Sequence, residues 1–226
     1  MGIPVLIIGE SGSGKTYSIK NFEPQEVGIY MVEKSRMPFK KKFDNVLKDA
    51  KYGDILRSLN KSKLKRYVID DSQYLMVNEF FDRAKETGYQ KYTDIGLNFR
   101  NLIHMINHNL ADDIIVYFLH HTETSDTGSV KAKTVGKLLD NYLTIEGCFN
   151  IVLMCVAEGN EHFFMTQSDG RATAKSPEGM FELKISNDLK AVDTAIREYY
   201  ELGGLERWEK EETGTMYRHT TERVQL

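Results

Sequence analysis

Residues 6–19 read "LIIGESGSGKTYSI", and this stretch decides the fold class of the chain. An apolar run stops at Gly9, a loop of small residues follows, and the chain restarts at a lysine and a threonine. Residues 9–16 fit the pattern G-x-x-x-x-G-K-[ST], between an expected strand at 3–8 and an expected helix at 15–21. In that context the backbone N–H groups of a loop with few side chains can approach phosphate oxygens, and the helix start adds its positive dipole end.

The last two residues of this loop match the needs of a nucleoside triphosphate. Lys15 would bridge the β- and γ-phosphates, and the Thr16 hydroxyl would hold Mg²⁺. A ligand-free turn rich in glycine and serine is the alternative, but it explains neither the lysine nor the hydroxyl. We therefore expect the nucleotide to contact the whole loop and the residue after it. These residues are Gly9, Glu10, Ser11, Gly12, Ser13, Gly14, Lys15, Thr16 and Tyr17.

Short strands alternate with helices over the first part of the chain, which favours a mostly parallel sheet with helices on both faces. The expected strands are 3–8, 27–32, 66–71 and 113–120, and the expected helices after 15–21 are 72–85 and 97–110.

The pattern changes after residue 137, where successive strands joined by turns predict an antiparallel extension of the sheet. The expected elements are strands at 148–159, 161–168 and 179–186 and a closing helix at 189–204. We therefore expect one α/β domain over residues 1–204. The remainder, 205–226, is charged and lacks periodicity, so we expect a flexible tail there.

Polar side chains follow three of the expected parallel strands. The third strand ends in Asp70 and Asp71, either of which would support the metal, and the sequence leaves the choice open. Glu33 follows the second strand and would orient or deprotonate the attacking water, although a solvated acid at a strand end is the alternative. His120 and His121 end the fourth strand, where one imidazole would bond the γ-phosphate. Open α/β sheets bind ligands at the carboxyl edge, so we expect these groups to meet there.

Composition and missing motifs argue against several classes of protein. The 226 residues carry 30 basic and 33 acidic side chains, and the net charge of −3 excludes a polycation that coats nucleic acid. The chain lacks the D-x-x-G motif of GTPase switches, and it has no arginine between Arg100 and Arg171 for the lid of a small-molecule kinase. The segment "HMINH" (104–108) lacks the glutamate of a zinc-protease helix. Two basic clusters, 34–42 and 61–66, either follow a nucleic-acid backbone or form a solvated face.

The order of these segments resembles the RecA-type ATPase core. The carrying segments are "GESGSGKT" (9–16), "YMVEKS" (30–35), "YVIDDSQYL" (67–75), "VYFLHHTE" (116–123), "TVGKLLDN" (134–141) and "RATAKSPEG" (171–179). From about residue 3 to residue 200 the chain is most similar to small phage-encoded ATP-binding proteins, regarded as truncated RecA-like recombinases with a role in single-strand annealing. The resemblance implies a RecA-like P-loop NTPase core that binds ATP and Mg²⁺. It also implies an ATPase activity that serves DNA recombination, annealing or replication support.

The resemblance assigns roles to individual residues. Lys15 and Glu33 fall at catalytic positions, and His121 falls near the polar residue that senses the γ-phosphate. Lys175 resembles the cation that a neighbouring subunit inserts toward the γ-phosphate, and such a cation is worth about 10³–10⁵ in rate. Thr16, together with Asp70 or Asp71, would support the metal.

The resemblance also implies that two loops, 83–96 and 122–137, face single-stranded DNA. Tyrosines in the first would stack on bases, and lysines in both would meet phosphates, although loop lysines that are only solvated are the alternative. The candidate contacts are Lys85, Tyr89, Lys91, Tyr92, Lys131 and Lys133.

Partners and location follow from the same likeness. Because the first strand begins at residue 3, the N-terminal segment by which RecA recombinases form filaments would be missing, and a ring or short homo-oligomer stays open. We expect single-stranded DNA as a partner, along with a single-strand-binding protein or a helicase. No apolar run reaches the roughly 20 residues of a membrane span, so we expect no membrane partner and a cytoplasmic location, in the host cell if the protein is phage-encoded. Two alternatives stay open: a non-hydrolysing nucleotide switch such as a helicase loader, and a small-molecule phosphotransferase.

Overall fold

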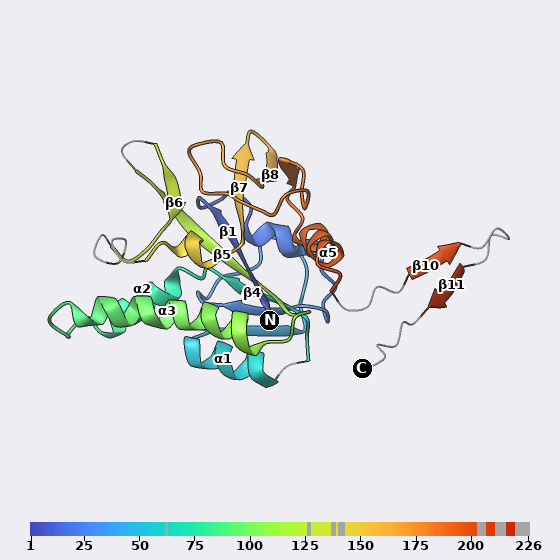
Figure 1. The fold of residues 1–226 in the computed structure, drawn as a ribbon. Helices are drawn as coiled ribbons and strands as arrows, with labels where there is room; N and C mark the ends of the chain where they lie inside the picture. The colour runs from blue at the N-terminus through green and yellow to red at the C-terminus, as the bar shows by residue number, and fades with distance from the viewer. Residues whose placement is uncertain are drawn as a thin grey trace.

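A computed structural model describes residues 1–61, 63–125, 128–136, 139 and 143–202, and the backbone of 207–210 and 216–219. Its centre is a mixed β-sheet in the order β3-β2-β4-β5-β1-β7-β8-β9, and β6 pairs with β5 beside this path (Figure 1). The strands of this sheet are β1 (Ile3–Gly9), β2 (Gly28–Met31), β3 (Asn45–Lys48), β4 (Arg66–Asp70), β5 (Ile115–Thr124), β6 (Val130–Ala132), β7 (Ile151–Glu158), β8 (Glu161–Met165) and β9 (Lys184–Ser186). The helices are η1 (Thr16–Asn21), α1 (Tyr52–Lys61), α2 (Tyr74–Asp82), α3 (Gln90–Asn109), η2 (Ile145–Cys148) and α5 (Leu189–Tyr199).

The sheet is parallel from β3 to β7 along its path, and it is antiparallel at β8 and β9. The central strands are apolar along nearly their whole length because helices cover both of their faces. This arrangement confirms the predicted α/β class, with a mostly parallel sheet flanked by helices and an antiparallel extension.

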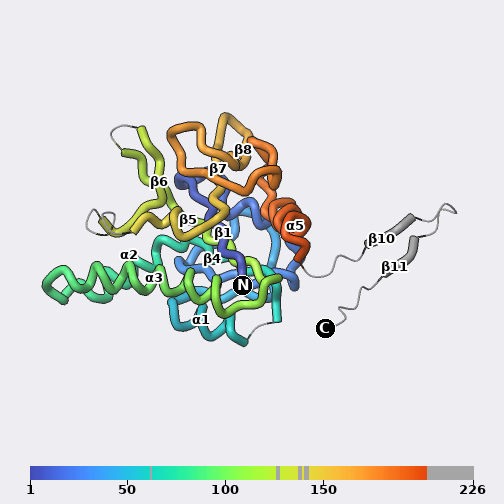
Figure 2. The backbone as a smooth tube through the Cα atoms, viewed as in Figure 1, coloured from blue at the N-terminus to red at the C-terminus, as the bar shows by residue number. Residues whose placement is uncertain are grey.

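Alternate residues of β1 point to opposite faces of the sheet and enter two separate cores. Leu6 and Ile8 belong to the core that contains Phe99 of α3. Val5 and Ile7 belong to the core that contains residues of η1 and α5. Figure 2 shows the result, with α1 and α3 on one side of the strands and α5 on the other.

The helix expected at 15–21 is found as a 3₁₀ helix, Thr16–Asn21, whose 6 residues are too few to supply a strong dipole. Phe22 is already extended, with ψ 142°. The next residue, Glu23, precedes Pro24, and a following proline disfavours helical backbone. Because the helix is so short, we expect less help from its dipole than the sequence pattern predicts.

Several other elements differ from the expectations. The sequence patterns miss β3, α1 and β6 altogether. Helix α3 begins at Gln90, seven residues before the predicted start at 97, so the predicted loop at 83–96 is wrong over 90–96. In the predicted tail, β10 (Arg207–Lys210) pairs with β11 (Met216–His219), and the other residues of 205–226 lie outside the described residues. Among the helices of the described chain, none has the length and apolar character that crossing a bilayer requires.

Candidate functional site

The carboxyl ends of four strands meet at one edge of the sheet. Strand β5 lies between β1 and β4, and its His121 pairs in register with Gly9 of β1. On the far side of β4, Asp70 pairs with the residue of β2 that comes two positions before Glu33. The register therefore brings the glycine-rich loop (residues 9–16) to the same edge as the acidic and histidine side chains, as the sequence predicts.

These groups border one cavity of about 940 Å³, a size typical of small-molecule sites. Glu33, Asp71 and His121 line it together with most of the predicted nucleotide contacts. Those contacts are Glu10, Ser11, Gly12, Gly14, Lys15, Thr16 and Tyr17. Of the described residues with a predicted role there, Gly9, Ser13 and Asp70 are buried and do not line the cavity.

Lys15 is buried at the base of the cavity and bonds only neutral groups. Its Nζ donates to the carbonyl oxygens of Gly9 and Glu10, each at 2.8 Å. The residue is 6% exposed, and burial lowers the pKa of its ammonium group. An anion in the cavity would supply the charged partner that such a buried cation otherwise lacks among the described residues.

Side chains from the antiparallel extension hold the back of the glycine-rich loop. Cys155 Sγ and His162 Nδ1 both donate to the carbonyl oxygen of Ser13, at 3.1 and 2.8 Å. Asn187 Nδ2 donates to the carbonyl oxygen of Gly14 at 3.2 Å. Gly14 has φ +101°, and a Cβ there would lie 2.6 Å from Asn187 Nδ2, so the contact requires glycine.

The backbone N–H groups of the loop are oriented differently from its carbonyls. Whereas the carbonyls bond side chains behind the loop, the N–H groups of Gly12 and Gly14 have no backbone acceptor within the described chain. A Cβ built at Gly12, which has φ +81°, would meet nothing within 4 Å. N–H groups that have no acceptor in an open concave loop can bind phosphate oxygens.

Asp70, and not Asp71, lies beside the Thr16 hydroxyl. Thr16 Oγ1 donates to Asp70 Oδ1 at 2.9 Å. Asp70 is 2% exposed, and burial, with the neighbouring Asp71 charge, raises its pKa to about 6. Asp71 has a φ of 61° and accepts a hydrogen bond from His121 Nε2 at 3.1 Å. The geometry thus separates two carboxylates that the sequence leaves equivalent.

The two histidines of β5 have different surroundings. His120 is fully buried, its Nε2 donates to the carbonyl oxygen of Lys133 at 2.8 Å, and its Nδ1 lies 2.9 Å from Ser72 Oγ. Burial lowers the pKa of His120 to about 4. His121 lines the cavity, and its ring meets Tyr74 edge-on at a centroid distance of 5.9 Å. Of the two, only His121 can contact a ligand in the cavity.

Glu33 is held at the cavity by helix α2. Asn78 Nδ2 donates to Glu33 Oε1 at 3.0 Å. The same helix carries Tyr74, which contacts His121. Helix α2 therefore contacts both the predicted water-activating carboxylate and the predicted phosphate sensor.

The polar side chains of the site could contribute only part of a Mg²⁺ coordination shell, so phosphate and water would supply most of the ligands. Within the described chain, no group of three or more His, Cys, Asp or Glu residues could hold a metal by itself. Nucleotide-bound Mg²⁺ needs only one or two protein ligands, which Thr16 and Asp70 would provide. Thr122 also lines the cavity, and its buried hydroxyl has no hydrogen-bond partner in the described chain.

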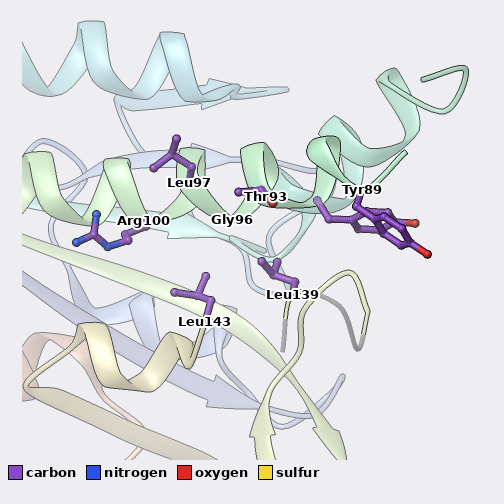
Figure 3. Close-up of a pocket in the computed structure, with 8 residues that line it drawn as sticks. Tyr89, Thr93, Gly96, Leu97, Arg100, Leu139 and Leu143 are labelled. Atoms are coloured by element: carbon purple, nitrogen blue, oxygen red, sulfur yellow. The ribbon is translucent and has the colours of Figure 1, made fainter. Parts of the chain in front are cut away.

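The first predicted DNA-facing segment borders a second, apolar groove of about 650 Å³ (Figure 3). Tyr89, which is 76% exposed, and Tyr92 line one end of this groove. Arg100 lies further along α3, and Leu139 and Leu143 face α3 from the opposite wall (Figure 3). The two tyrosines are thus brought together, as base stacking would require.

The lysines of that segment lie apart from the groove. Lys85 is exposed in the turn after α2. Lys91 lies on the first turn of α3, where its Nζ is 5.0 Å from the centroid of the Phe80 ring and donates to the carbonyl oxygen of Glu86. Neither lysine lines the groove among the described residues.

The second predicted DNA-facing segment, 122–137, is a β-hairpin over much of its length instead of a loop. Thr122–Thr124 pair with Val130–Ala132, and residues 126, 127 and 137 lie outside the described residues. Lys131 pairs with Glu123 at 2.9 Å across the hairpin. Lys133 lines the cavity of the glycine-rich loop, so its nearest ligand site is that cavity.

Lys175 is exposed and distant in register from the glycine-rich loop. Its backbone exchanges two 2.8 Å hydrogen bonds with Val152, near the start of β7. It is absent from the described lining of the cavity. A contact between Lys175 and a nucleotide would therefore have to be made to the site of another chain.

Among the residues to which sequence patterns assign no role here, Arg36, Asn78 and His162 line the cavity or hold its parts, and Lys133, predicted as a DNA contact, also lines it. Arg36 lies in the basic cluster 34–42, so charge alone could have suggested it. Asn78 and His162 carry no such signal, because their roles depend on which strand or helix they pack against.

No model of a known protein family matches the chain, and a comparison with curated proteins likewise gives no match. The architecture alone therefore defines the class of this protein: α/β, with a mostly parallel mixed sheet flanked by helices and some antiparallel strands.

Proposed function

We propose that the chain is a RecA-like P-loop ATPase that binds Mg²⁺-ATP in the cavity of the glycine-rich loop and acts on single-stranded DNA. Its work would be recombination, single-strand annealing or replication support. The observation that carries this proposal is the convergence of Lys15, Thr16, Glu33, Asp71 and His121 on one cavity. The free N–H groups of the loop support an anionic ligand there.

Phosphoryl transfer depends mainly on positioning and electrostatic stabilisation, and the chain offers a group for each task. Lys15 would bind phosphate oxygens in place of its two carbonyl acceptors. Glu33 would accept a proton from the attacking water, held in position by Asn78. His121 would donate to the γ-phosphate and transmit its loss to Asp71. Mg²⁺ at Thr16 and Asp70 would neutralise phosphate charge.

Helix α2 offers a route from the cavity to the predicted DNA-facing segment. Tyr74 at the start of α2 contacts His121, and Asn78 near the middle of α2 bonds Glu33. Just after its end, Arg83 pairs with Glu79 of α2, with Glu86 of the following turn and with Asp94 of α3. A shift of α2 on hydrolysis would therefore reach the tyrosines at the start of α3.

The same proposal extends to partners and location. A homo-oligomer would allow Lys175 of one subunit to reach the site of the next. A single-strand-binding protein or a helicase would be the protein partner, and the cytoplasm would be the site of action.

The test is ATPase activity at low salt, with and without single-stranded DNA, for the wild type and Glu33→Gln. The proposal predicts Mg²⁺-dependent hydrolysis that DNA changes at least a few-fold, and a loss of roughly 10²–10⁴ in rate in the variant. Tight ATP binding with background hydrolysis, unaffected by the variant, would indicate a nucleotide switch. Turnover that requires a small acceptor and ignores DNA would indicate a phosphotransferase. If DNA alters neither turnover nor ATP affinity, the role in recombination is wrong.

A further inference from the structure

Arg36 lines the cavity of the glycine-rich loop, although no sequence motif assigns it a role there. It belongs to the basic cluster 34–42 and comes three residues after Glu33. Three residues of chain span at most about 11 Å, so Arg36 starts from the side of the cavity where the water-activating carboxylate lies. Arg36 and Glu33 both line the cavity, so a phosphate near Glu33 would lie on the side from which Arg36 starts.

The segment that carries Arg36 is fastened to η1, the helix that follows Thr16. Phe39 meets the Tyr17 ring edge-on at a centroid distance of 6.1 Å. Lys41 Nζ donates to the carbonyl oxygen of Lys20 at 2.9 Å. Arg36 therefore lies in the chain between Glu33 and the Phe39–Tyr17 contact, and both Glu33 and Tyr17 line the cavity.

Arg36 also differs from two neighbouring cations of its cluster. Lys34 pairs with Asp49, and Lys41 bonds a backbone carbonyl. Within the described chain, the Arg36 guanidinium has no hydrogen bond or ion pair, although the cavity wall contains Glu10 and Glu33. An arginine that stands uncommitted beside a phosphate-binding loop is free to form the bidentate contact that its planar fork makes with phosphate.

We propose that Arg36 is a γ-phosphate-binding residue that acts in cis, on the nucleotide bound by its own chain. This inference rests on the proposed function. It adds the cluster 34–42 to the groups that would discriminate ATP from ADP, beside His121 of the same chain and Lys175 of another chain. A single chain would then recognise the triphosphate without assembling.

The experiment compares the affinities of the full chain for a non-hydrolysable ATP analogue and for ADP, by titration calorimetry with Mg²⁺. The variants are Arg36→Ala, Arg36→Lys and the matched control Lys40→Ala, because Lys40 is an exposed cation of the same cluster outside the cavity lining of the described chain. Loss of a charged contact to the γ-phosphate should weaken analogue binding by roughly 10- to 100-fold in Arg36→Ala and leave ADP binding within about 3-fold. Arg36→Lys should lie between the wild type and Arg36→Ala, and Lys40→Ala should match the wild type.

Three results would overturn the proposal. Affinities for the analogue and for ADP that both stay at wild-type values in Arg36→Ala would mean that Arg36 does not contact the γ-phosphate. Equal weakening of both ligands would show that the residue only supports the loop. A wild type that binds neither nucleotide would reject the proposed function as well, which separates the failure of the site from the failure of Arg36 alone.

Discussion

The Thr16 hydroxyl donates to Asp70 Oδ1 over 2.9 Å, which joins the last residue of the glycine-rich loop to the last residue of β4. Asp71, one residue later, bonds His121 instead. Two adjacent carboxylates therefore have separate partners. We expect them to have separate effects on metal-dependent binding.

Asp70→Asn should weaken Mg²⁺-dependent ATP binding more than Asp71→Asn, because only Asp70 lies against the proposed metal-binding hydroxyl. The measurement is ATP affinity as a function of Mg²⁺ concentration. We expect the Asp70 variant to need at least about 10-fold more Mg²⁺ for half-maximal binding, as when an outer partner of a metal ligand is lost. The opposite order, with Asp71→Asn the more damaging, would contradict the assignment.

Asn78→Ala should lower kcat while the affinity for ATP stays close to that of the wild type. Asn78 bonds Glu33 and lies on α2 outside the glycine-rich loop, so its removal frees the carboxylate without touching the phosphate contacts. We expect a fall in kcat of roughly 10-fold, and no further fall when Glu33→Gln is also present. A loss of affinity without a loss of kcat would show that Asn78 supports binding and does not position Glu33.

The stability of the ligand-free protein should depend on pH through His120. Because burial lowers the pKa of this imidazole from 6.5 in the unfolded chain to about 4 in the folded protein, the unfolded chain binds the extra proton first. The stabilisation is therefore complete above about pH 6.5 and is lost as the pH falls toward 4, by roughly 3 kcal/mol. Urea unfolding from pH 7 to pH 4 should show a shallower decline for His120→Gln than for wild type. The exposed His108→Gln is the control, and equal slopes in all three proteins would refute the explanation.

A buried charge network joins α5 to the sheet, away from the cavity. Asp193, 1% exposed, accepts from Arg66, Arg197 and the Tyr117 hydroxyl at 2.6 to 3.0 Å. Asp193→Ala should lower the free energy of unfolding by about 3–5 kcal/mol, because it removes the buried charge that two largely covered arginines share. The exposed pair of Asp82 with Lys51 offers the comparison, and Asp82→Ala should cost less than about 1 kcal/mol. Similar losses in the two variants would contradict this account.

The parts of the fold that sequence predicts are those with a strong local pattern. The apolar strands β1, β4 and β5 are buried on both faces, and their continuous Ile, Val and Leu runs mark them. Strand β3 is not predicted from the sequence because only Val46 of its four residues is even partly buried, so the strand lacks a pattern of apolar residues. The early start of α3 is not predicted because Gln90–Asp94 are mostly polar and form no apolar stripe. Asp94 instead pairs with Arg83.

The candidate site follows the same division. The glycine-rich loop, Glu33 and the acidic pair are predictable because each lies at a strand end, and strand ends converge by topology. The choice between Asp70 and Asp71 depends on backbone angles, with Asp71 at φ 61°, and no residue pattern encodes that choice. The approach of His162 and Asn187 to the back of the loop depends on pairing between β7, β8 and β9, which is set by contacts far apart in sequence.

The most direct measurement of the central claim is the ATP affinity of Lys15→Ala, with folding checked by circular dichroism. Lys15 is a buried residue of the loop, and its only hydrogen-bond acceptors in the described chain are the two carbonyls of Gly9 and Glu10. If the loop binds a triphosphate, the folded variant should lose Mg²⁺-ATP binding by at least about 10-fold and lose turnover with it. A folded Lys15→Ala protein that binds and hydrolyses ATP as the wild type does would contradict the account.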